Sequence, residues 1–187
     1  MTVYREDWPW AIEECALLAK IATENWDSLY EDHPIEHHND PTFNKWVDYT
    51  KFKDTSAWSL ISAISDRILT IANESDHPWR DSYDWVCKGI TRWDPGTFME
   101  AHVDSPTGWE DRDLAALLYL NDGFEGGVLQ FPKLDLEIVP QAGTLIMFPC
   151  MGEEYTHNVT QVDGLSLDNI PRYTFSCWFQ KMFRGQK

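Results

Sequence analysis

Apolar residues recur at helical spacing in two stretches of the first half of the chain. Spacing of three or four residues places such side chains on one face, so both stretches are predicted to be amphipathic helices. Between them, residues 31–54 are rich in Pro, His, Asp and Asn, which predicts an irregular loop. The helical positions are Ile12, Cys15, Ala19, Ala22 and Trp26, followed by Ile61, Ile64, Ile68 and Ile71.

From about Asp84 onward the pattern changes to short β-type segments separated by turn residues. Turns are predicted at residues 121–123, 125–127 and 140–143, where Gly, Asn, Asp and Pro gather. Eight short strands in this order are typical of an antiparallel jelly roll. The predicted strands are residues 85–92, 97–104, 114–121, 128–131, 134–139, 144–148, 155–162 and 172–180.

The length of 187 residues and an apolar fraction of 43% fit one globular domain with a full core. We expect a mainly β fold with N-terminal helices, that is, a double-stranded β-helix (jelly-roll) core flanked by helices. In this interpretation residues 1–187 form a single domain. Residues 1–83 supply the helical support, and residues 84–182 supply the core.

The formal net charge of −16 repels phosphate backbones and anionic membrane surfaces, so we expect neither nucleic acid nor membrane as a partner. The acidity favours neutral or cationic substrates, and it is equally explained as a means of keeping the protein soluble. The N-terminal residues lack the apolar segment of a signal peptide. Four scattered cysteines form no C-x-x-C pair, which suggests reduced thiols and a cytoplasmic location. The sequence does not indicate an oligomeric state.

A candidate metal site lies in the second predicted strand. Period-two alternation places His102 and Asp104 on the same face, where they can share an ion. His157, several predicted strands later, is a candidate third ligand. Two His and one carboxylate on one side of an ion form the facial triad of non-haem iron(II). Taken alone, however, an H-x-D pair on a strand is more often a surface pair than a set of ligands.

The last predicted strand has one polar and one apolar face. Arg172, Thr174 and Ser176 fall on the polar face, which for a lone strand is most simply a solvated surface. Arg172 is the only Lys or Arg between His157 and Lys181. If a dicarboxylate binds beside the metal, Arg172 is the candidate partner from this strand, because a planar guanidinium suits bidentate carboxylate binding.

Several motifs occur together in a fixed order between about Trp93 and Phe179. In this combination and order the chain resembles the prolyl 4-hydroxylase-like branch of the 2-oxoglutarate dioxygenases, whereas the first half of the chain carries no comparable motif. The motifs are Trp93-Asp94-Pro95-Gly96, His102-Val103-Asp104-Ser105-Pro106, Arg112 with Tyr119-Leu120-Asn121-Asp122, Glu125-Gly126-Gly127, Pro140 to Gly143, His157, and Arg172-Tyr173-Thr174.

The resemblance implies a role for each matching residue. His102, Asp104 and His157 would bind iron(II), and Arg172 and Tyr119 would hold the distal carboxylate of 2-oxoglutarate. Thr174 would be an auxiliary donor. Tyr119 also has a simpler interpretation as a core aromatic residue on a central strand. The implied cofactors are iron(II), 2-oxoglutarate as cosubstrate and O2, with ascorbate as a reductant.

The sequence departs from the family's pattern at three places. Trp93 stands where the family usually has a Tyr that lines the cosubstrate pocket, so either that hydrogen bond is lost or the indole N–H replaces it. Ala115 replaces a common Thr. The stretch between His157 and Arg172 is longer than usual, and its residues 163–169 are predicted to form a protruding loop.

The resemblance implies a dioxygenase that hydroxylates an unactivated C–H bond. We favour a prolyl residue of a protein or peptide as substrate. A free amino acid or another small metabolite is the alternative, and a catalytically silent metal-binding jelly roll is a third. Trp109, in the loop of residues 105–112, is predicted either to lie at the substrate entrance or simply to pack. A peptide substrate predicts an open groove between residues 105–112 and 163–169, and a metabolite predicts a small closed pocket.

A second histidine cluster is less suited to metal binding. His33, His37 and His38 lie in a loop interrupted by Pro34, and we expect them to be solvated.

Overall fold

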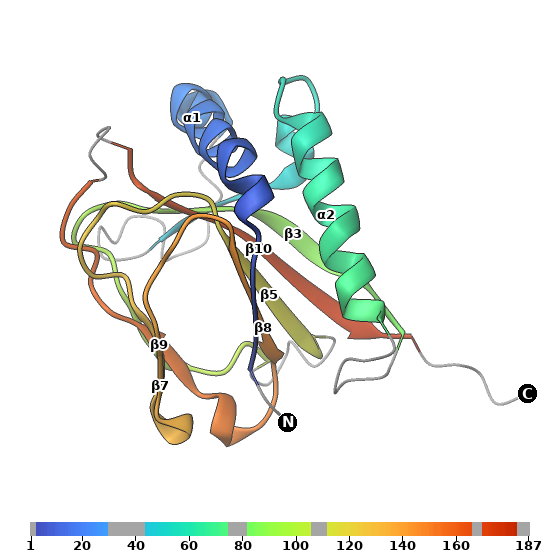
Figure 1. The fold of residues 1–187 in the computed structure, drawn as a ribbon, viewed down its shortest axis with the longest axis vertical. Helices are drawn as coiled ribbons and strands as arrows, with labels where there is room; N and C mark the ends of the chain where they lie inside the picture. Colours follow the sequence, from blue (N-terminus) through green and yellow to red (C-terminus); the bar gives the residue numbers. More distant parts are fainter. Residues whose placement is uncertain (1–2, 30–43, 75–81, 106–111, 166–169, 183–187) are drawn as a thin grey trace, which may run out of the picture.

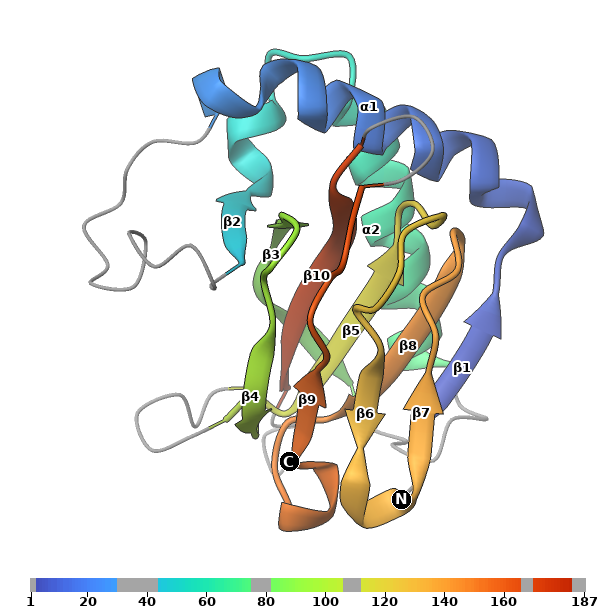
Figure 2. The same ribbon diagram turned by 90° about the vertical axis from the view of Figure 1, so that its left-hand side faces the viewer.

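The computed structural model describes residues 3–29, 44–74, 82–105, 112–165 and 170–182. These residues form three layers, which are two helices, a six-stranded sheet and a four-stranded sheet (Figures 1 and 2). The four-stranded sheet faces one side of the larger sheet, and the helices cover the other side. This arrangement and the antiparallel pairing confirm the predicted jelly-roll core with flanking helices.

The six-stranded sheet has the strand order β1-β8-β5-β10-β3-β2, and every neighbouring pair is antiparallel. β10 lies between β5 and β3 and is therefore a central strand. The strands are β1 (Tyr4–Asp7), β2 (Lys45–Asp48), β3 (Tyr83–Trp93), β5 (Leu114–Tyr119), β8 (Thr144–Pro149) and β10 (Arg172–Lys181).

The four-stranded sheet has the order β4-β9-β6-β7 and is also antiparallel. His102 on β4 pairs directly with His157 on β9, which joins two segments that are far apart in sequence. The strands are β4 (Met99–His102), β6 (Leu129–Phe131), β7 (Leu136–Ile138) and β9 (His157–Val159), with 3-10 turns at Pro132–Leu134 and Glu153–Tyr155.

The helices α1 (Ile12–Leu29) and α2 (Trp58–Asn73) lie side by side across the outer face of the large sheet (Figure 1). Short 3-10 turns at Pro9–Ala11 and Tyr49–Phe52 precede them. Their apolar faces pack on the side chains of alternate β10 residues, such as Tyr173 and Phe175, in one buried cluster. No helix among the described residues is long and apolar enough to span a membrane.

A second apolar cluster fills part of the space between the two sheets. It includes Phe131 and Val159 from the small sheet and Tyr119 and Phe148 from the large sheet. Since successive residues of a strand point to opposite faces, the same large-sheet strands supply both clusters. The sheet therefore carries one face toward the helices and one toward the smaller sheet, where the functional residues lie.

All eight strands predicted from the sequence are present, with ends shifted by a few residues. Two further strands, β1 and β2, lie in the half that was predicted to be helical. β2 corrects the predicted irregular loop of residues 31–54, because Lys45–Asp48 pairs with β3. Both strands have only four residues and lie at the sheet edges. Their conformation depends on a partner strand that is distant in sequence.

Candidate metal centre and cosubstrate pocket

A cavity of about 530 Å³ opens between the two sheets. Its volume is typical of a small-molecule site. It is lined by residues of both sheets, which include the three predicted metal ligands and Arg172. The lining is mostly apolar, with the ionisable groups gathered at a few points.

The three predicted metal ligands lie together at this cavity. The Nε2 atoms of His102 and His157 lie 3.3 Å and 3.6 Å from Oδ1 of Asp104. One ligand atom from each residue lies within 4.8 Å of the other two, and no other group of this kind occurs among the described residues. Two imidazoles and one carboxylate in this arrangement fit a metal that keeps open coordination positions. The residues present therefore fit the implied iron(II).

Each imidazole is oriented by its own strand. Nδ1 of His102 lies 2.8 Å from the carbonyl oxygen of Glu100, and Nδ1 of His157 lies 3.0 Å from that of Tyr155. A carbonyl only accepts, so Nδ1 carries the proton in both rings. The lone pair of each neutral ring is then on Nε2, which is the atom that faces Asp104. Such a hydrogen bond on the far nitrogen is usual for metal-binding His residues.

Asp104 is held by a residue of the other sheet. The indole Nε1 of Trp178 on β10 donates a hydrogen bond to Oδ2 of Asp104 over 3.0 Å. Oδ1 is the oxygen that faces the two imidazoles, so this bond leaves one oxygen for a metal. The carboxylate of Asp104 can therefore bind a metal through Oδ1 alone.

The electrostatics of the triad suit a cation. Burial would raise the pKa of Asp104, but the hydrogen bond with His102 and the two nearby imidazoles lower it below its usual value. Burial lowers the pKa of His157, with Asp104 acting in the opposite direction. The pKa of His102 is raised, because its hydrogen bonds with Asp104 and with the Glu100 carbonyl outweigh burial. A charged carboxylate thus faces two imidazole nitrogens that can each offer a lone pair to a metal.

Arg172 is a buried cation that forms no ion pair with a carboxylate of the described residues. Its residue is 1% exposed, and its Nε and Nη1 atoms have no hydrogen-bond partner among the described residues. The guanidinium stacks over the ring of Trp93, with 4.4 Å from Cζ to the ring centre. Burial lowers the pKa of Arg172, and Tyr119 opposes this effect. An unpaired buried charge is costly, so this one is explained best by a bound anion.

Two further polar groups beside Arg172 also lack partners. The phenolic oxygen of Tyr119 and the indole nitrogen of Trp93 are buried and make no hydrogen bond to a described residue. The Tyr119 ring centre lies 5.4 Å from Cζ of Arg172. The interpretation of Tyr119 as a core residue accounts for its burial and leaves its hydroxyl unsatisfied. Arg172, Tyr119 and Trp93 thus place hydrogen-bond donors close together, as an anion site requires. Their predicted roles toward 2-oxoglutarate stay predictions.

The close approach of Arg172 to the small sheet depends on Gly127. This residue has a φ of +65°, which favours glycine, and a Cβ placed there would lie 3.1 Å from Cδ and 3.3 Å from Nε of Arg172. The Glu125-Gly126-Gly127 motif therefore makes room for the guanidinium.

Thr174 lies on the same face of β10, two residues beyond Arg172. Its hydroxyl lies 3.2 Å from that of Ser176, which in turn lies 2.9 Å from the hydroxyl of Thr91 on β3. This row of hydroxyls forms a polar strip on the cavity wall. The auxiliary role predicted for Thr174 stays a prediction.

The structure also places residues that sequence analysis did not assign to the site. Trp178, Trp46 and Cys87 line the cavity. Arg112, which was assigned to a motif without a role, lines it too, and its guanidinium lies 4.6 Å from the ring centre of Trp178. For Trp178, continued period-two alternation beyond Ser176 was a usable signal in the sequence.

Of the remaining residues that the sequence analysis discussed for the site, Ala115 lies in the part of the chain that the structure describes. Ala115 is buried on the cavity-facing side of β5, opposite Trp178 in the sheet register. Trp109, His33, His37 and His38 lie outside the described residues, as does most of the predicted loop of residues 163–169.

The comparison with protein families agrees with this site. Residues 89–180 match the sequence model of the 2OG-Fe(II) oxygenase superfamily, and this region contains the three candidate ligands and Arg172. A curated relative, prolyl 3-hydroxylase 1 of Gallus gallus, is 40% identical over 65 residues. This match covers 32% of the chain and only 9% of that protein.

Solved structures agree with the fold over nearly the whole chain. A Pseudomonas putida prolyl-4-hydroxylase superposes with a TM-score of 0.66 at 22% identity, covering 96% of this chain and 92% of that one. The viral collagen prolyl hydroxylase of Paramecium Bursaria Chlorella virus-1 gives 0.63 at 17% identity, with 97% of both chains covered. A Trichoplax adhaerens prolyl hydroxylase gives 0.70 at 13% identity, with 95% and 83% covered.

The fold and the site together define a class of protein. Residues 89–180, which contain the site, match the 2OG-Fe(II) oxygenase superfamily. This confirms the predicted resemblance to prolyl 4-hydroxylase-like dioxygenases. The implied iron(II) and 2-oxoglutarate agree with this family.

Proposed function

We propose that this protein is an iron(II)- and 2-oxoglutarate-dependent dioxygenase that hydroxylates a prolyl residue of a protein or peptide. The observation that carries the proposal is the position of two sets of ligand-binding side chains in one cavity. His102, Asp104 and His157 can hold a metal ion. The buried Arg172 guanidinium has two nitrogens without a hydrogen-bond partner among the described residues, so it suits an anion. 2-Oxoglutarate can occupy both sites, because one end chelates a metal and the other end is a carboxylate.

Bound iron(II) with 2-oxoglutarate would supply the oxidation of an unactivated C–H bond by O2. The residues of this chain bind and orient the reactants. Nε2 of His102, Nε2 of His157 and Oδ1 of Asp104 would hold the metal, with Trp178 keeping the second carboxylate oxygen away from it. Arg172 and Tyr119 would fix the distal carboxylate of the cosubstrate.

Apolar residues surround these polar groups. The cavity wall includes the apolar side chains of Met99, Leu129, Phe148 and Val159. A ligand that fills the space beside them would leave little room for water. Exclusion of water strengthens the pairing of Arg172 with a carboxylate. It also protects a reactive oxidant from side reactions.

The prolyl substrate is supported by the comparisons. The curated relative and the three structural neighbours are all named as prolyl hydroxylases, and the Trichoplax adhaerens protein is in complex with a peptide fragment. Hydroxylation of a free amino acid or other metabolite is the second candidate, and a silent metal-binding module is the third. The predicted groove between residues 105–112 and 163–169 involves residues outside the described part of the chain.

The test uses the full chain with iron(II), 2-oxoglutarate, O2 and ascorbate. We expect succinate formation that increases when a proline-containing peptide is added, and one added oxygen on a prolyl residue by mass spectrometry. An added oxygen on a free amino acid, with none on any peptide, would contradict the prolyl proposal. Absence of succinate under all conditions would contradict a dioxygenase.

A further inference from the structure

Part of the cavity wall comes from residues that the metal and cosubstrate groups do not include. These are Asn44 and Trp46 at the edge of the large sheet, together with Cys87 and Arg112. Trp46 is the large side chain that the edge strand β2 contributes to this wall. β2 pairs only with β3, so its other edge is open among the described residues.

The ring of Trp46 lies across the cavity face of β3 because residue 89 is glycine. A Cβ at Gly89 would lie 2.7 Å from two atoms of the Trp46 ring, and 2.3 Å from the carbonyl oxygen of Val47. Real atoms do not approach so closely, so any side chain here would displace both the ring and β2. Gly89 thus holds open the space that allows an indole to form part of the cavity wall.

The indole of Trp46 carries an unused donor. Its Nε1 is buried and has no hydrogen-bond partner among the described residues. A buried N–H without an acceptor is unfavourable, so a cavity-lining residue in this state is suited to a ligand that brings an acceptor.

The charges around the cavity narrow the class of that ligand. Among the described lining residues, Asp104 is the only carboxylate, and it belongs to the metal triad. A free amino acid would bring an ammonium group, and no carboxylate of the described lining residues is left to pair with it. A residue within a peptide is neutral there and brings a backbone carbonyl, which is an acceptor.

We propose that Trp46 is a substrate-contact residue of this enzyme. Its ring forms a wall against the target residue of a peptide substrate, and its Nε1 donates a hydrogen bond to a substrate backbone carbonyl. This inference rests on the proposed function and names the substrate as peptide-bonded and uncharged at the contact. The polar strip formed by Thr91 and Ser176 lies beside Trp46 in the sheet, since Thr91 is its register partner.

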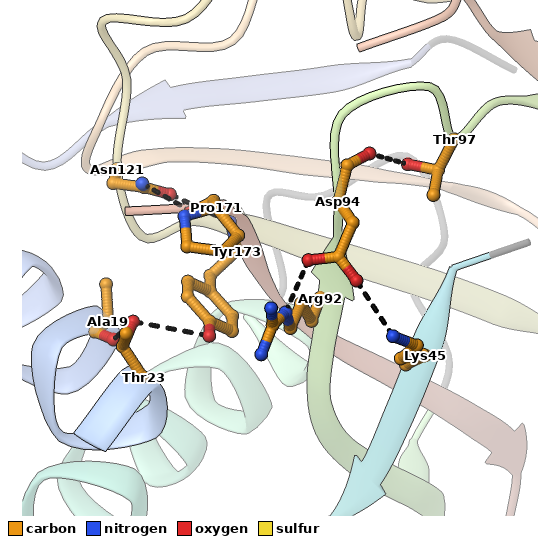
Figure 3. Close-up of polar contacts among 9 residues, drawn as sticks. All are labelled: Ala19, Thr23, Lys45, Arg92, Asp94, Thr97, Asn121, Pro171 and Tyr173. Carbon is orange, nitrogen blue, oxygen red and sulfur yellow. Dashed lines mark hydrogen bonds and ion pairs between the residues drawn. The ribbon is translucent and has the colours of Figure 1, made fainter. Parts of the chain in front are cut away.

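The position of Trp46 is fixed by an ion-pair cluster on the neighbouring residue. Nζ of Lys45 lies 2.9 Å from Oδ2 of Asp94, and Nε of Arg92 lies 2.7 Å from Oδ1 of the same carboxylate (Figure 3). Arg92 and Asp94 are at the end of β3, so Asp94 ties β2 to β3 directly beside Trp46. The short edge strand is thereby held with the indole toward the cavity.

The experiment compares Trp46→Ala, Trp46→Phe and Gly89→Ala with the unchanged chain, using a proline-containing peptide that the unchanged chain hydroxylates. We expect Trp46→Ala to raise KM for the peptide about tenfold, which corresponds to the loss of one aromatic contact and one hydrogen bond. Trp46→Phe keeps a ring and loses the donor, so its increase should be smaller. Gly89→Ala should resemble Trp46→Ala, because it displaces the indole. Trp10→Ala is the matched control, since Trp10 is 59% exposed and outside the cavity.

A binding measurement gives a second readout. In protein labelled with nitrogen-15, the indole N–H signal that disappears in Trp46→Phe should shift when the peptide is added, whereas the signal of Trp10 should not. Circular dichroism establishes that each variant is folded. An unchanged KM in both Trp46 variants, or a Trp46 signal that does not respond to the peptide, would overturn the assignment. If the unchanged chain hydroxylates no peptide, the proposed function fails instead.

Discussion

The two faces of β10 are both buried, but they differ in how completely their groups are satisfied. Tyr173, Phe175 and Cys177 face the helices and lie in a continuous apolar cluster. Arg172 and Thr174, one position away on the same strand, face the cavity, and Nε and Nη1 of Arg172 have no hydrogen-bond partner among the described residues. Burial alone therefore does not distinguish a core residue from a site residue. On this strand the difference is one of charge, because the guanidinium of Arg172 keeps these two buried nitrogens without a partner among the described residues, and burying a charge without a partner is costly.

The largest effect is expected at the metal triad. His102→Ala removes one of three ligands, and we expect turnover to be lost and iron(II) affinity to fall by more than about 100-fold. Secondary structure should be unchanged, because His102 is at the end of a short strand. Calorimetric titration with iron(II) under anaerobic conditions measures the affinity. Glu100→Gln on the same strand has an exposed side chain and is the control. Retained turnover in His102→Ala would exclude the metal assignment.

One variant on each face of β10 can distinguish a residue that binds the cosubstrate from a residue that stabilises the fold. Arg172→Met should weaken 2-oxoglutarate binding by about 30- to several-thousand-fold, the effect of losing a buried charge pair worth about 2–5 kcal/mol. It should leave the free energy of unfolding of the unliganded chain unchanged or higher, since an unpaired buried cation is removed. Phe175→Ala should instead lower that free energy by about 3–5 kcal/mol.

These two variants are measured by chemical denaturation and by cosubstrate titration. Arg172 would be a core residue like Phe175 if Arg172→Met destabilised the unliganded chain as strongly as Phe175→Ala. An unchanged cosubstrate affinity in Arg172→Met would show that the anion binds elsewhere.

A smaller effect, on the free energy of unfolding, is expected for Asp94, which joins β2 to the end of β3. Burial would raise the pKa of Asp94, but its hydrogen bonds with Lys45 and Arg92 lower it below the usual 3.8. A lowered pKa stabilises the folded chain above pH 3.8, and this contribution is lost as the pH falls through the lower folded value. Asp94→Asn should therefore cost about 1 kcal/mol at neutral pH, a value reduced by the partial exposure of all three side chains.

The measurement for Asp94 is the free energy of unfolding of both chains as a function of pH. The difference between the unchanged chain and Asp94→Asn should decrease on acidification below about pH 4. Asp66→Asn, on the exposed side of α2, provides the control. A difference that does not change with pH would show that Asp94 acts through packing alone.

The sequence predicts the parts of this molecule whose pattern is local. Period-two alternation separated Arg172 from Tyr173, and the turn residues marked the eight core strands. Alternation was wrong about Asp104, because β4 ends at His102 and Asp104 lies in a bend two residues later, although its carboxylate still faces the imidazole of His102. The order of the motifs then selected His157, which pairs with His102 only through the sheet. The roles of these residues stay predictions until they are tested.

The features that the sequence did not predict depend on contacts between segments that are distant in the chain. Lys45–Asp48 lies among turn-forming residues, so its sequence alone gives little sign of a strand, and only pairing with β3 makes it one. Trp46 reaches the cavity because of Gly89, 43 positions later in the chain. Trp178 bonds Asp104 across the two sheets. The contact between Trp46 and Gly89 and the bond between Trp178 and Asp104 each join residues whose separation in the sequence follows no regular period.

The two halves of the site belong to different sheets. His157 is on β9 and His102 is on β4, in the small sheet, whereas Arg172 and Tyr119 belong to the large one. Before any ligand binds, the bond between Trp178 and Asp104 links the two sheets at this point. A molecule that binds to the metal and to Arg172 at once would connect the two sheets. The bound cosubstrate would then slow the separation of the two sheets. The amide hydrogens of the facing strands would therefore exchange more slowly with cosubstrate and iron than with iron alone.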